Sequence, residues 1–144
     1  MSEIVIATES LHKFYGSRDQ KVHALNSVDI SIEEGEIVGV MGPSGCGKTT
    51  LLNCLSGLDS IDSGTILIQG QTLTDLNDDQ LSELRAKRMG FVFQTYNLLP
   101  VLTAVENVEL PLLVSGFSGK EARSKALAKL AEVELEDWQQ HLPG

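Results

Sequence analysis

The segment from Gly42 to Thr49 has residue types and spacing that suit one kind of chemistry, the binding of phosphate groups. It matches the pattern G-x-x-x-x-G-K-[ST] in full. Glycines let a backbone curl so that successive N–H groups face phosphate oxygens without a Cβ in the way. We therefore predict a phosphate-binding loop, with ATP as its nucleotide. The loop residues are Gly42, Pro43, Ser44, Gly45, Cys46, Gly47, Lys48 and Thr49.

Three side chains at the end of this loop carry distinct chemistry. Lys48 can reach the β- and γ-phosphates, and Thr50 can add a hydrogen bond near the α-phosphate. The Thr49 hydroxyl suits Mg²⁺, which prefers oxygen ligands. A helix that begins near Gly47 adds unpaired N–H groups and the positive end of its dipole. A chance glycine-rich turn is the alternative, and the strand and helix patterns on either side disfavour it.

The elements around the loop follow from apolar patterns. The uninterrupted run Ile37 to Met41 is typical of a strand covered on both faces of a parallel sheet. Further strands are expected at 4–7, 28–32, 66–68 and 91–93. Leucines at helical spacing predict a helix after the loop, from residues Leu51, Leu52, Leu55 and Leu58. The chain therefore has the pattern of an α/β protein.

The last third of the chain is expected to be helical. Asn77 or Asp78 can cap a short helix that reaches about Lys87, and capping-box spacing predicts helix starts at Thr103 and Ser118. The final helix should have one apolar face, made by Ala122, Ala126, Leu127, Leu130 and Val133.

Bulk composition limits the class of protein. A length of 144 residues allows one hydrophobic core, and a net charge of -9 disfavours nucleic acid as the main partner. No stretch approaches the roughly 18 consecutive apolar residues of a membrane span, and the N-terminus lacks the pattern of a secretory signal. The two cysteines, Cys46 and Cys54, are expected to be free thiols in a reducing cytoplasm.

Four further segments decide between the many kinds of protein that use such a loop. They are LHKFYG, which contains Tyr15; GLDSIDSGTILIQG after the loop; GFVFQTYNLLPVLTAVENVELPLL, which contains Gln94; and HLPG at the end. Together with the loop they resemble the ATP-binding subunits of ABC transporters. The resemblance is closest to the group that serves lipoprotein release and macrolide export, and it extends through essentially all 144 residues.

The resemblance implies a role for each matching position. Tyr15 looks like the aromatic residue that stacks on adenine, and Gly42 to Thr50 look like the Walker A loop. Gln94 looks like the Q-loop glutamine, which acts at the γ-phosphate and would share the Mg²⁺ with Thr49. Lys48 and Gln94 would thus be the catalytic residues of this chain.

The resemblance also implies an architecture and partners. Residues 1–94 would form the ATP-binding core of a P-loop NTPase, with antiparallel N-terminal strands. Residues 95–144 would form the Q-loop and the beginning of the α-helical subdomain. The expected partners are a transmembrane permease subunit and a second ATP-binding subunit. The expected location is cytoplasmic, peripheral on the inner face of a bacterial plasma membrane.

The family's signature, Walker B and switch motifs normally follow a segment like HLPG, and the 144 residues do not contain them. We therefore expect the N-terminal portion of a longer domain, with the C-terminal half absent and little or no ATP hydrolysis by this portion alone. One alternative is a non-hydrolysing regulatory or scaffold module at a membrane complex. Another is a small P-loop kinase, which is disfavoured because no lid carrying arginines is apparent.

Overall fold

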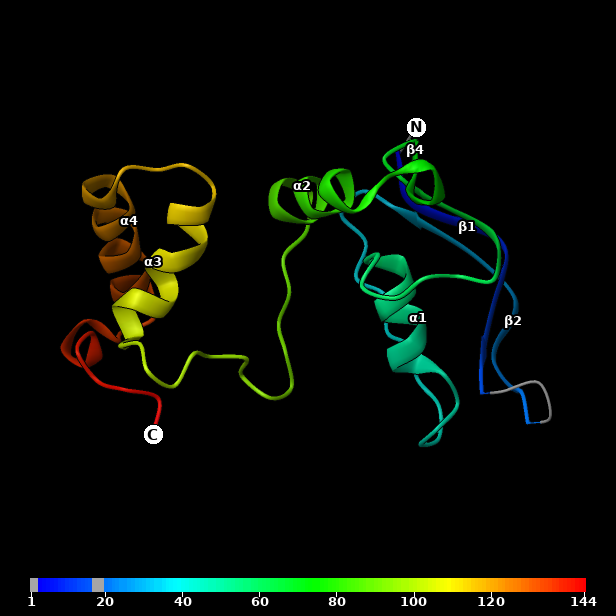
Figure 1. Cartoon of the computed structure of the whole chain (residues 1–144), viewed down its shortest axis with the longest axis horizontal. Helices are drawn as coiled ribbons and strands as arrows, with labels where there is room; N and C mark the ends of the chain where they lie inside the picture. The colour runs from blue at the N-terminus through cyan, green and yellow to red at the C-terminus, as the bar shows by residue number, and fades with distance from the viewer. Residues whose placement is uncertain (1–2, 17–19) are drawn as a thin grey trace. The chain divides into compact units, whose positions relative to one another are not determined.

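The protein is described by a computed structural model that covers residues 3–16 and 20–144. The chain divides into two compact units, Met1–Gly90 and Phe91–Gly144. The first unit contains the β-sheet and the second contains helices without strands among its described residues (Figure 1). The predicted division at residue 94 lies four residues from this boundary and stays a prediction.

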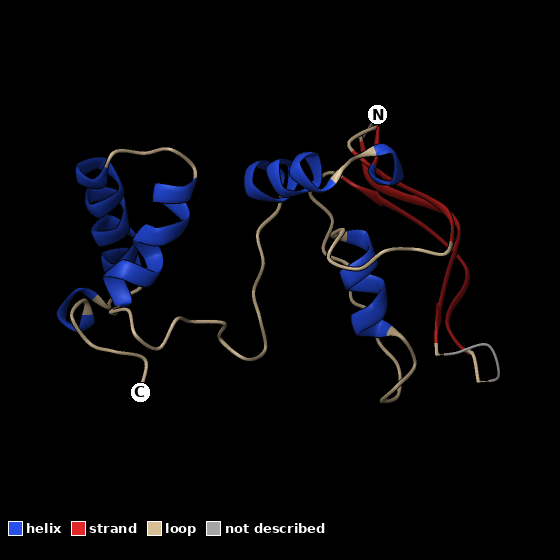
Figure 2. Cartoon of the chain, in the orientation of Figure 1, coloured by secondary structure: helices blue, strands red, loops and turns tan. Residues whose placement is uncertain are grey.

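The first unit is built on an antiparallel sheet of four strands (Figure 2). Its strands are β1 (Ile4–Tyr15), β2 (Val22–Glu33), β3 (Ser63–Ile68) and β4 (Gln71–Thr72), in the spatial order β2-β1-β3-β4. Thr8 in the central strand pairs with Ile30 on one side and Ile66 on the other. The strands expected at 4–7, 28–32 and 66–68 lie inside these longer elements, so the antiparallel N-terminal strands are confirmed.

Two predicted strands are absent, and both predictions were wrong for this structure. Ile37 to Met41 has no strand conformation, and the side chains of Ile37 and Met41 are 101% and 91% exposed. The segment 91–93 is likewise irregular and exposed. A strand is stabilised by backbone hydrogen bonds to a neighbour, and neither segment has a ladder partner among the described residues. All ladders that the structure describes are antiparallel.

Helix α1 (Lys48–Leu55) packs against this sheet and continues the phosphate loop. Leu51, Cys54 and Leu55 on α1 are buried in one cluster with Leu11 and Leu25 of the sheet. Leu52 and Leu58 are 56% and 51% exposed, so the apolar face of the helix is narrower than predicted. The cluster fixes α1, and with it the end of the loop, on the sheet.

The remaining helices begin where the sequence predicted. They are α2 (Asp78–Arg88), α3 (Ala104–Val114) and α4 (Gly119–Glu132), with 3-10 turns η1 (Leu73–Asp75) and η2 (Glu136–Trp138). Each α-helix of this group has a complete capping box. The N-cap and partner residues are Asn77 with Gln80, Thr103 with Glu106, and Ser118 with Glu121. Local hydrogen bonds therefore set these helix starts.

Helices α3 and α4 pack on each other in the second unit. Val105, Ala126 and Leu130 form the buried cluster, and Ala122 is also buried. Val133 was expected on the same face but is 61% exposed, because α4 ends before it and its backbone has left the helical path. Among the described residues, no helix is long and apolar enough to cross a membrane.

The packing of α1 gives a direct stability test. Leu55→Ala removes a side chain that is 8% exposed, whereas Leu52→Ala removes one that is 56% exposed on the same helix. We expect Leu55→Ala to lower the free energy of unfolding by about 2–5 kcal/mol, and Leu52→Ala to change it by about 0.5 kcal/mol or less. Urea unfolding monitored by circular dichroism measures both values, and equal losses would contradict the packing described.

Candidate functional site

The loop before α1 depends on glycine at two positions where the backbone is left-handed. Gly45 has φ +81° and Gly47 has φ +96°, a region that L side chains rarely adopt. Gly47 also lies close to β2, because a Cβ placed on it would be 2.5 Å from the carbonyl oxygen of Ala24. The glycines of the motif therefore shape the turn and allow it to approach the sheet.

Lys48 folds back across the loop that precedes it. Its Nζ donates hydrogen bonds of 2.8 Å to the carbonyl oxygens of Gly42 and Pro43. The Sγ of Cys46 lies 3.6 Å from the same ammonium. The positive charge is thus placed inside the curve of the loop, where an anion would meet it.

The first turn of α1 differs from that of the other α-helices. Its N-cap, Gly47, supplies no side-chain acceptor, and the turn has no acidic residue. In the part of the chain that the structure describes, the N–H groups of Lys48, Thr49 and Thr50 have no backbone acceptor. Free N–H groups and the positive end of a helix dipole together favour an anion. The geometry therefore suits a phosphate group.

A pocket of about 490 Å³ opens beside the loop. Its lining combines the loop residues Ser44 to Thr50 with Tyr15, Val22, His23 and Ala24 from the facing ends of β1 and β2. The structure thus brings Tyr15, the predicted adenine contact, to the same pocket as the predicted phosphate loop. The three residues of β2 were not singled out from the sequence, and only the pairing of Tyr15 with Val22 across the hairpin could have pointed to them.

Tyr15 lies at the end of β1, and the residue is 42% exposed. Its hydroxyl donates a 2.5 Å hydrogen bond to Asp59 Oδ2. This hydrogen bond raises the pKa of the Tyr15 phenol, while the side chain of Thr50 acts in the opposite direction. The hydroxyl end of the side chain is therefore held by Asp59, while part of the residue stays open to solvent.

Lys13 lies two residues earlier on the same face of β1 and is 7% exposed. Its Nζ donates to Asp59 Oδ1 at 2.8 Å, to the Ser60 carbonyl at 2.6 Å and to Ser60 Oγ at 3.3 Å. The hydrogen bond to Asp59 raises the pKa of Lys13 against the effect of burial, and the same bond lowers the pKa of Asp59. Sequence reasoning missed this pair, whose members are 46 positions apart.

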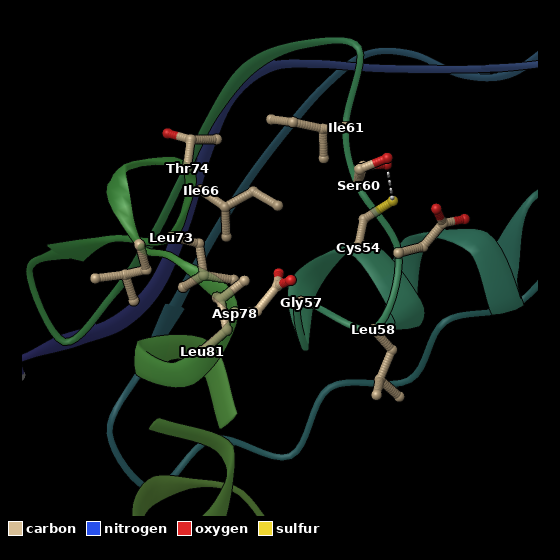
Figure 3. A pocket seen from close by; sticks show the side chains of 12 residues that line it. Cys54, Gly57, Leu58, Ser60, Ile61, Ile66, Leu73, Thr74, Asp78 and Leu81 are labelled. Carbon is tan, nitrogen blue, oxygen red and sulfur yellow. Dashed lines mark hydrogen bonds between the residues drawn. The ribbon is translucent and has the colours of Figure 1, made fainter. Parts of the chain in front are cut away.

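The loop between α1 and β3 also borders a second pocket, of about 510 Å³ (Figure 3). Its lining includes Leu58, Asp59 and Ser60 from that loop, together with Leu73 and Leu81. At the base of the loop, the Cys54 thiol lies 3.8 Å from the Ser60 carbonyl oxygen that it faces. One side of the loop that carries Asp59 is thus not packed against other described residues.

Gln94 belongs to the second compact unit, where it is exposed and lies in a turn. The prediction that Gln94 ends a strand was wrong, because residues 91–93 form none. Thr49 is exposed on the pocket lining, and its hydroxyl makes no hydrogen bond to another described residue. The roles predicted for Thr49 and Gln94 at a metal ion stay predictions.

Comparisons with known proteins agree with this geometry. Residues 25–143 match the family described as ABC transporter. The chain is 43% identical over 136 residues to an uncharacterized ABC transporter ATP-binding protein, MJ0796 of Methanocaldococcus jannaschii, and covers 58% of that protein. It is 42% identical to the lipoprotein-releasing system ATP-binding protein LolD of Bacteroides thetaiotaomicron, with 96% of the chain and 62% of LolD covered.

A third relative is longer. The macrolide export ATP-binding/permease protein MacB of Hyphomonas neptunium is 42% identical over all 144 residues, which cover 22% of its length. Among solved structures, the dimeric post-hydrolysis state of MJ0796 bound to ADP and Pi matches with a TM-score of 0.87 and 42% identity. That match covers 96% of this chain and 61% of the solved chain. The chain therefore spans about three-fifths, or less, of the relatives it matches, as the resemblance implied.

The close approach of Gly47 to β2 predicts that an alanine substitution at Gly47 is more destabilising than one at Gly45. Gly45→Ala places its Cβ in open space and adds only backbone strain, whereas Gly47→Ala adds a clash with the Ala24 carbonyl. We expect Gly45→Ala to cost about 1–2 kcal/mol of unfolding free energy, and Gly47→Ala to cost more. Chemical denaturation compares the two, and a smaller loss in Gly47→Ala would contradict the described contact.

The Lys13–Asp59 ion pair predicts a pH dependence of stability. Because the folded-state pKa of Asp59 is below its ordinary value of 3.8, the pair contributes fully above pH 3.8 and is lost as pH falls through the folded value. The stability advantage of the wild type over Asp59→Asn should therefore shrink on acidification below pH 3.8. Denaturant unfolding at a series of pH values measures this difference.

A control comes from Glu83, whose carboxylate pairs with Lys87 on exposed α2. The hydrogen bond to Lys87 lowers the pKa of Glu83 as well, but solvent screens a pair whose side chains are 69% and 62% exposed. The corresponding difference between wild type and Glu83→Gln should be smaller at every pH. A larger acid effect in Glu83→Gln than in Asp59→Asn would disprove the assignment.

Proposed function

The chain belongs to the ABC transporter family, and we propose that it is the ATP-binding part of a transport ATPase. The resemblance seen in the sequence is thereby confirmed at the level of the family. In the proposed function, ATP binding and hydrolysis by the whole protein drive export or lipoprotein extraction at a membrane. This portion of the protein supplies the site that holds the nucleotide.

One observation carries the proposal: the predicted phosphate loop and the predicted base contact line the same pocket. The free N–H groups of Lys48, Thr49 and Thr50 would receive phosphate oxygens. The Lys48 ammonium would exchange its two carbonyl contacts for the β- and γ-phosphates. Tyr15 offers a partly exposed ring on which the adenine can stack.

The proposed cofactor is ATP together with Mg²⁺. The Thr49 hydroxyl fits a metal ligand, because it is an oxygen donor on the pocket lining with no competing hydrogen bond among described residues. Bound Mg²⁺ would neutralise charge on the β- and γ-phosphates. The loop residues then orient the triphosphate and place Lys48 beside its terminal groups. The part assigned to Gln94 rests on the family resemblance alone.

The proposed partners are a transmembrane permease and a second ATP-binding subunit. The names of LolD, MacB and the bacitracin export protein BceA of Halalkalibacterium halodurans describe release or export systems, and MJ0796 has a dimeric structure. On the second unit, Thr95 to Leu98 line a pocket with Pro143. Leu98, Leu99 and Val101 are exposed nearby in sequence, as a docking segment requires. The proposed location is the cytoplasmic face of the membrane.

The alternative, a regulatory or scaffold module that binds nucleotide without turnover, has no observation in its favour. LolD and MacB are named for release and export, and the match to MacB extends over all 144 residues. Both the transport ATPase and the regulatory module require nucleotide binding, so the first experiment measures nucleotide binding.

Nucleotide binding predicts a rise in thermal stability with Mg-ATP. A ligand that binds only the folded state contributes about 2.7 kcal/mol at one hundred times its dissociation constant. We expect the unfolding midpoint of the wild-type chain to rise with Mg-ATP and that of Lys48→Ala to rise much less. Differential scanning calorimetry at increasing nucleotide concentration measures both shifts.

Lys87→Ala is the matched control, because Lys87 is exposed on α2 and, among the residues that the structure describes, pairs with Glu83 alone. It should respond to Mg-ATP as the wild type does. A midpoint that does not move with Mg-ATP in the wild type, or one that moves equally in Lys48→Ala, would refute the proposed function.

A further inference from the structure

Asp59 joins two side chains of β1 that the proposed function treats separately. Its Oδ1 accepts from Lys13 Nζ at 2.8 Å, and its Oδ2 accepts from the Tyr15 hydroxyl at 2.5 Å. The Lys13 ammonium also lies 5.1 Å from the centroid of the Tyr15 ring. The carboxylate is thus shared between a buried cation and the aromatic residue proposed to contact the base.

Lys13 makes the position of the carboxylate unusually well defined. Its side chain is 8% exposed, and an ammonium taken out of water at this depth must be paired. The described hydrogen bonds of its Nζ all go to the loop after α1, to Asp59 and to the carbonyl and hydroxyl oxygens of Ser60. With one carboxylate oxygen fixed by Lys13, the other has little freedom, and it is the oxygen that receives the Tyr15 hydroxyl.

The loop that carries Asp59 is attached at both of its ends. The N–H groups of Leu58 and Asp59 donate to the Asn53 carbonyl of α1, at 2.9 and 3.2 Å. The Asp62 N–H donates to the His12 carbonyl, and the Phe14 N–H donates to Asp62 Oδ2. A pocket borders the loop on another side (Figure 3), and Ile61 of the loop packs against the apolar cluster of α1 and the sheet. Polar contacts and this one apolar contact together fix the position of the loop.

We infer that Asp59, held by Lys13, is a positioning residue that fixes the Tyr15 ring for the base of the nucleotide. The inference rests on the proposed function and deepens it. It assigns part of the preference for a ligand with a base to Lys13 and Asp59, two charged residues that lie behind Tyr15. Tyr15 is half-exposed at the end of a strand, and nothing else described holds its far end apart from the side chain of Thr50. A ring fixed before binding loses less rotational freedom on stacking, which strengthens binding.

The rival reading is purely structural, with Lys13 and Asp59 joining β1 to the loop and Tyr15 attached to them incidentally. The two readings differ in which ligands are affected. A positioning role acts on ligands that carry a base, whereas loss of structure weakens every ligand of the phosphate loop alike. Inorganic tripolyphosphate therefore separates the two readings, because it has the three phosphates of ATP and no base.

The experiment measures the affinities of the 144-residue chain for Mg-ATP and Mg-tripolyphosphate by isothermal titration calorimetry. The variants are Asp59→Asn, which removes the charge, and Tyr15→Phe, which keeps the ring and removes its hydroxyl. We expect each to weaken ATP binding by about three- to tenfold, the scale of one net hydrogen bond, and to leave tripolyphosphate binding unchanged. The double variant should be no weaker than either single one, because both remove the same contact.

Asp62→Asn is the matched control, with the same change in charge on the same loop. Asp59 accepts with both of its oxygens, and an amide has only one, whereas the described side-chain hydrogen bond of Asp62, from the Phe14 N–H, needs a single acceptor oxygen. It should bind ATP as the wild type does. The inference is overturned if Tyr15→Phe binds ATP normally, or if Asp59→Asn loses affinity for ATP and tripolyphosphate equally. If Asp59→Asn does not fold, Tyr15→Phe still decides, because it leaves the Lys13–Asp59 pair in place.

The outcomes also separate this inference from the function on which it rests. A wild type that binds neither ligand overturns both the inference and the proposed function. A Tyr15→Ala variant that keeps full affinity for ATP overturns the inference and the base-contact role, while the phosphate loop remains supported. The results thus distinguish a failure of the phosphate loop from a failure of the base contact.

A second readout needs no nucleotide. In a Tyr96→Phe background, Tyr15 is the remaining tyrosine, so its ionisation is followed by ultraviolet absorbance. The hydrogen bond to Asp59 raises the pKa of the Tyr15 phenol, so Asp59→Asn should ionise at lower pH than its parent, while Asp62→Asn should not. Identical titrations of the parent and Asp59→Asn would show that the carboxylate does not hold this hydroxyl, and would overturn the inference.

Discussion

The packing of one short helix against one antiparallel sheet determines the rest of the site. Helix α1 has eight residues, and its buried side chains share a single cluster with Leu11 of β1 and Leu25 of β2. The phosphate loop enters the helix at one end, and the loop that carries Asp59 leaves it at the other. The phosphate loop that lines the pocket and the loop whose Asp59 holds Tyr15 are therefore both positioned by α1, and a shift of α1 would move the two together.

Two lysines in this unit show how burial decides what a cation does. Lys13 is almost fully buried and pairs with a carboxylate, so its charge is compensated within the protein. Lys48 is more exposed, and among the described residues its ammonium contacts no carboxylate, only the carbonyl oxygens of Gly42 and Pro43 and the sulfur of Cys46. Neutral acceptors leave the net charge of Lys48 uncompensated, which suits a residue that must attract an anion. Lys13 therefore stabilises the fold through its ion pair, and Lys48 is available to a ligand.

Features that depend on neighbouring residues were predictable from the sequence. The loop follows from a motif whose glycines shape the local backbone. The start of α2 follows from a capping residue, and the starts of α3 and α4 follow from capping residues with partners three positions later. The strand expected at Ile37 to Met41 failed because a strand also needs a neighbour, and apolar composition does not supply one. The end of the apolar face at Val133 failed for a related reason, since periodicity does not show where α4 stops.

The residues of the candidate site also differ in whether the sequence alone could predict them. Lys48 and its neighbours were found directly, whereas Tyr15 was found through a family resemblance and not through any spacing. The Lys13–Asp59 pair could not be found, because a lysine in a strand and an aspartate in a turn are individually ordinary. Only the antiparallel register of β1 with β3, together with the return of the loop from α1, brings them together. Chemistry that depends on long-range contacts is visible only in the folded chain.

The strand order of the sheet has a consequence for the protein during its synthesis. The first strand made, β1, is the one that ends in the middle, between β2 and β3. Its hairpin partner follows at once, but the other edge stays unpaired until Ser63 to Ile68 have left the ribosome, a delay of seconds at roughly 5–20 residues per second. An open edge can recruit strands of other chains. The irregular register between Glu9 and His12, with Ser10 at φ +46°, interrupts that edge and makes the nascent hairpin a poorer template for aggregation.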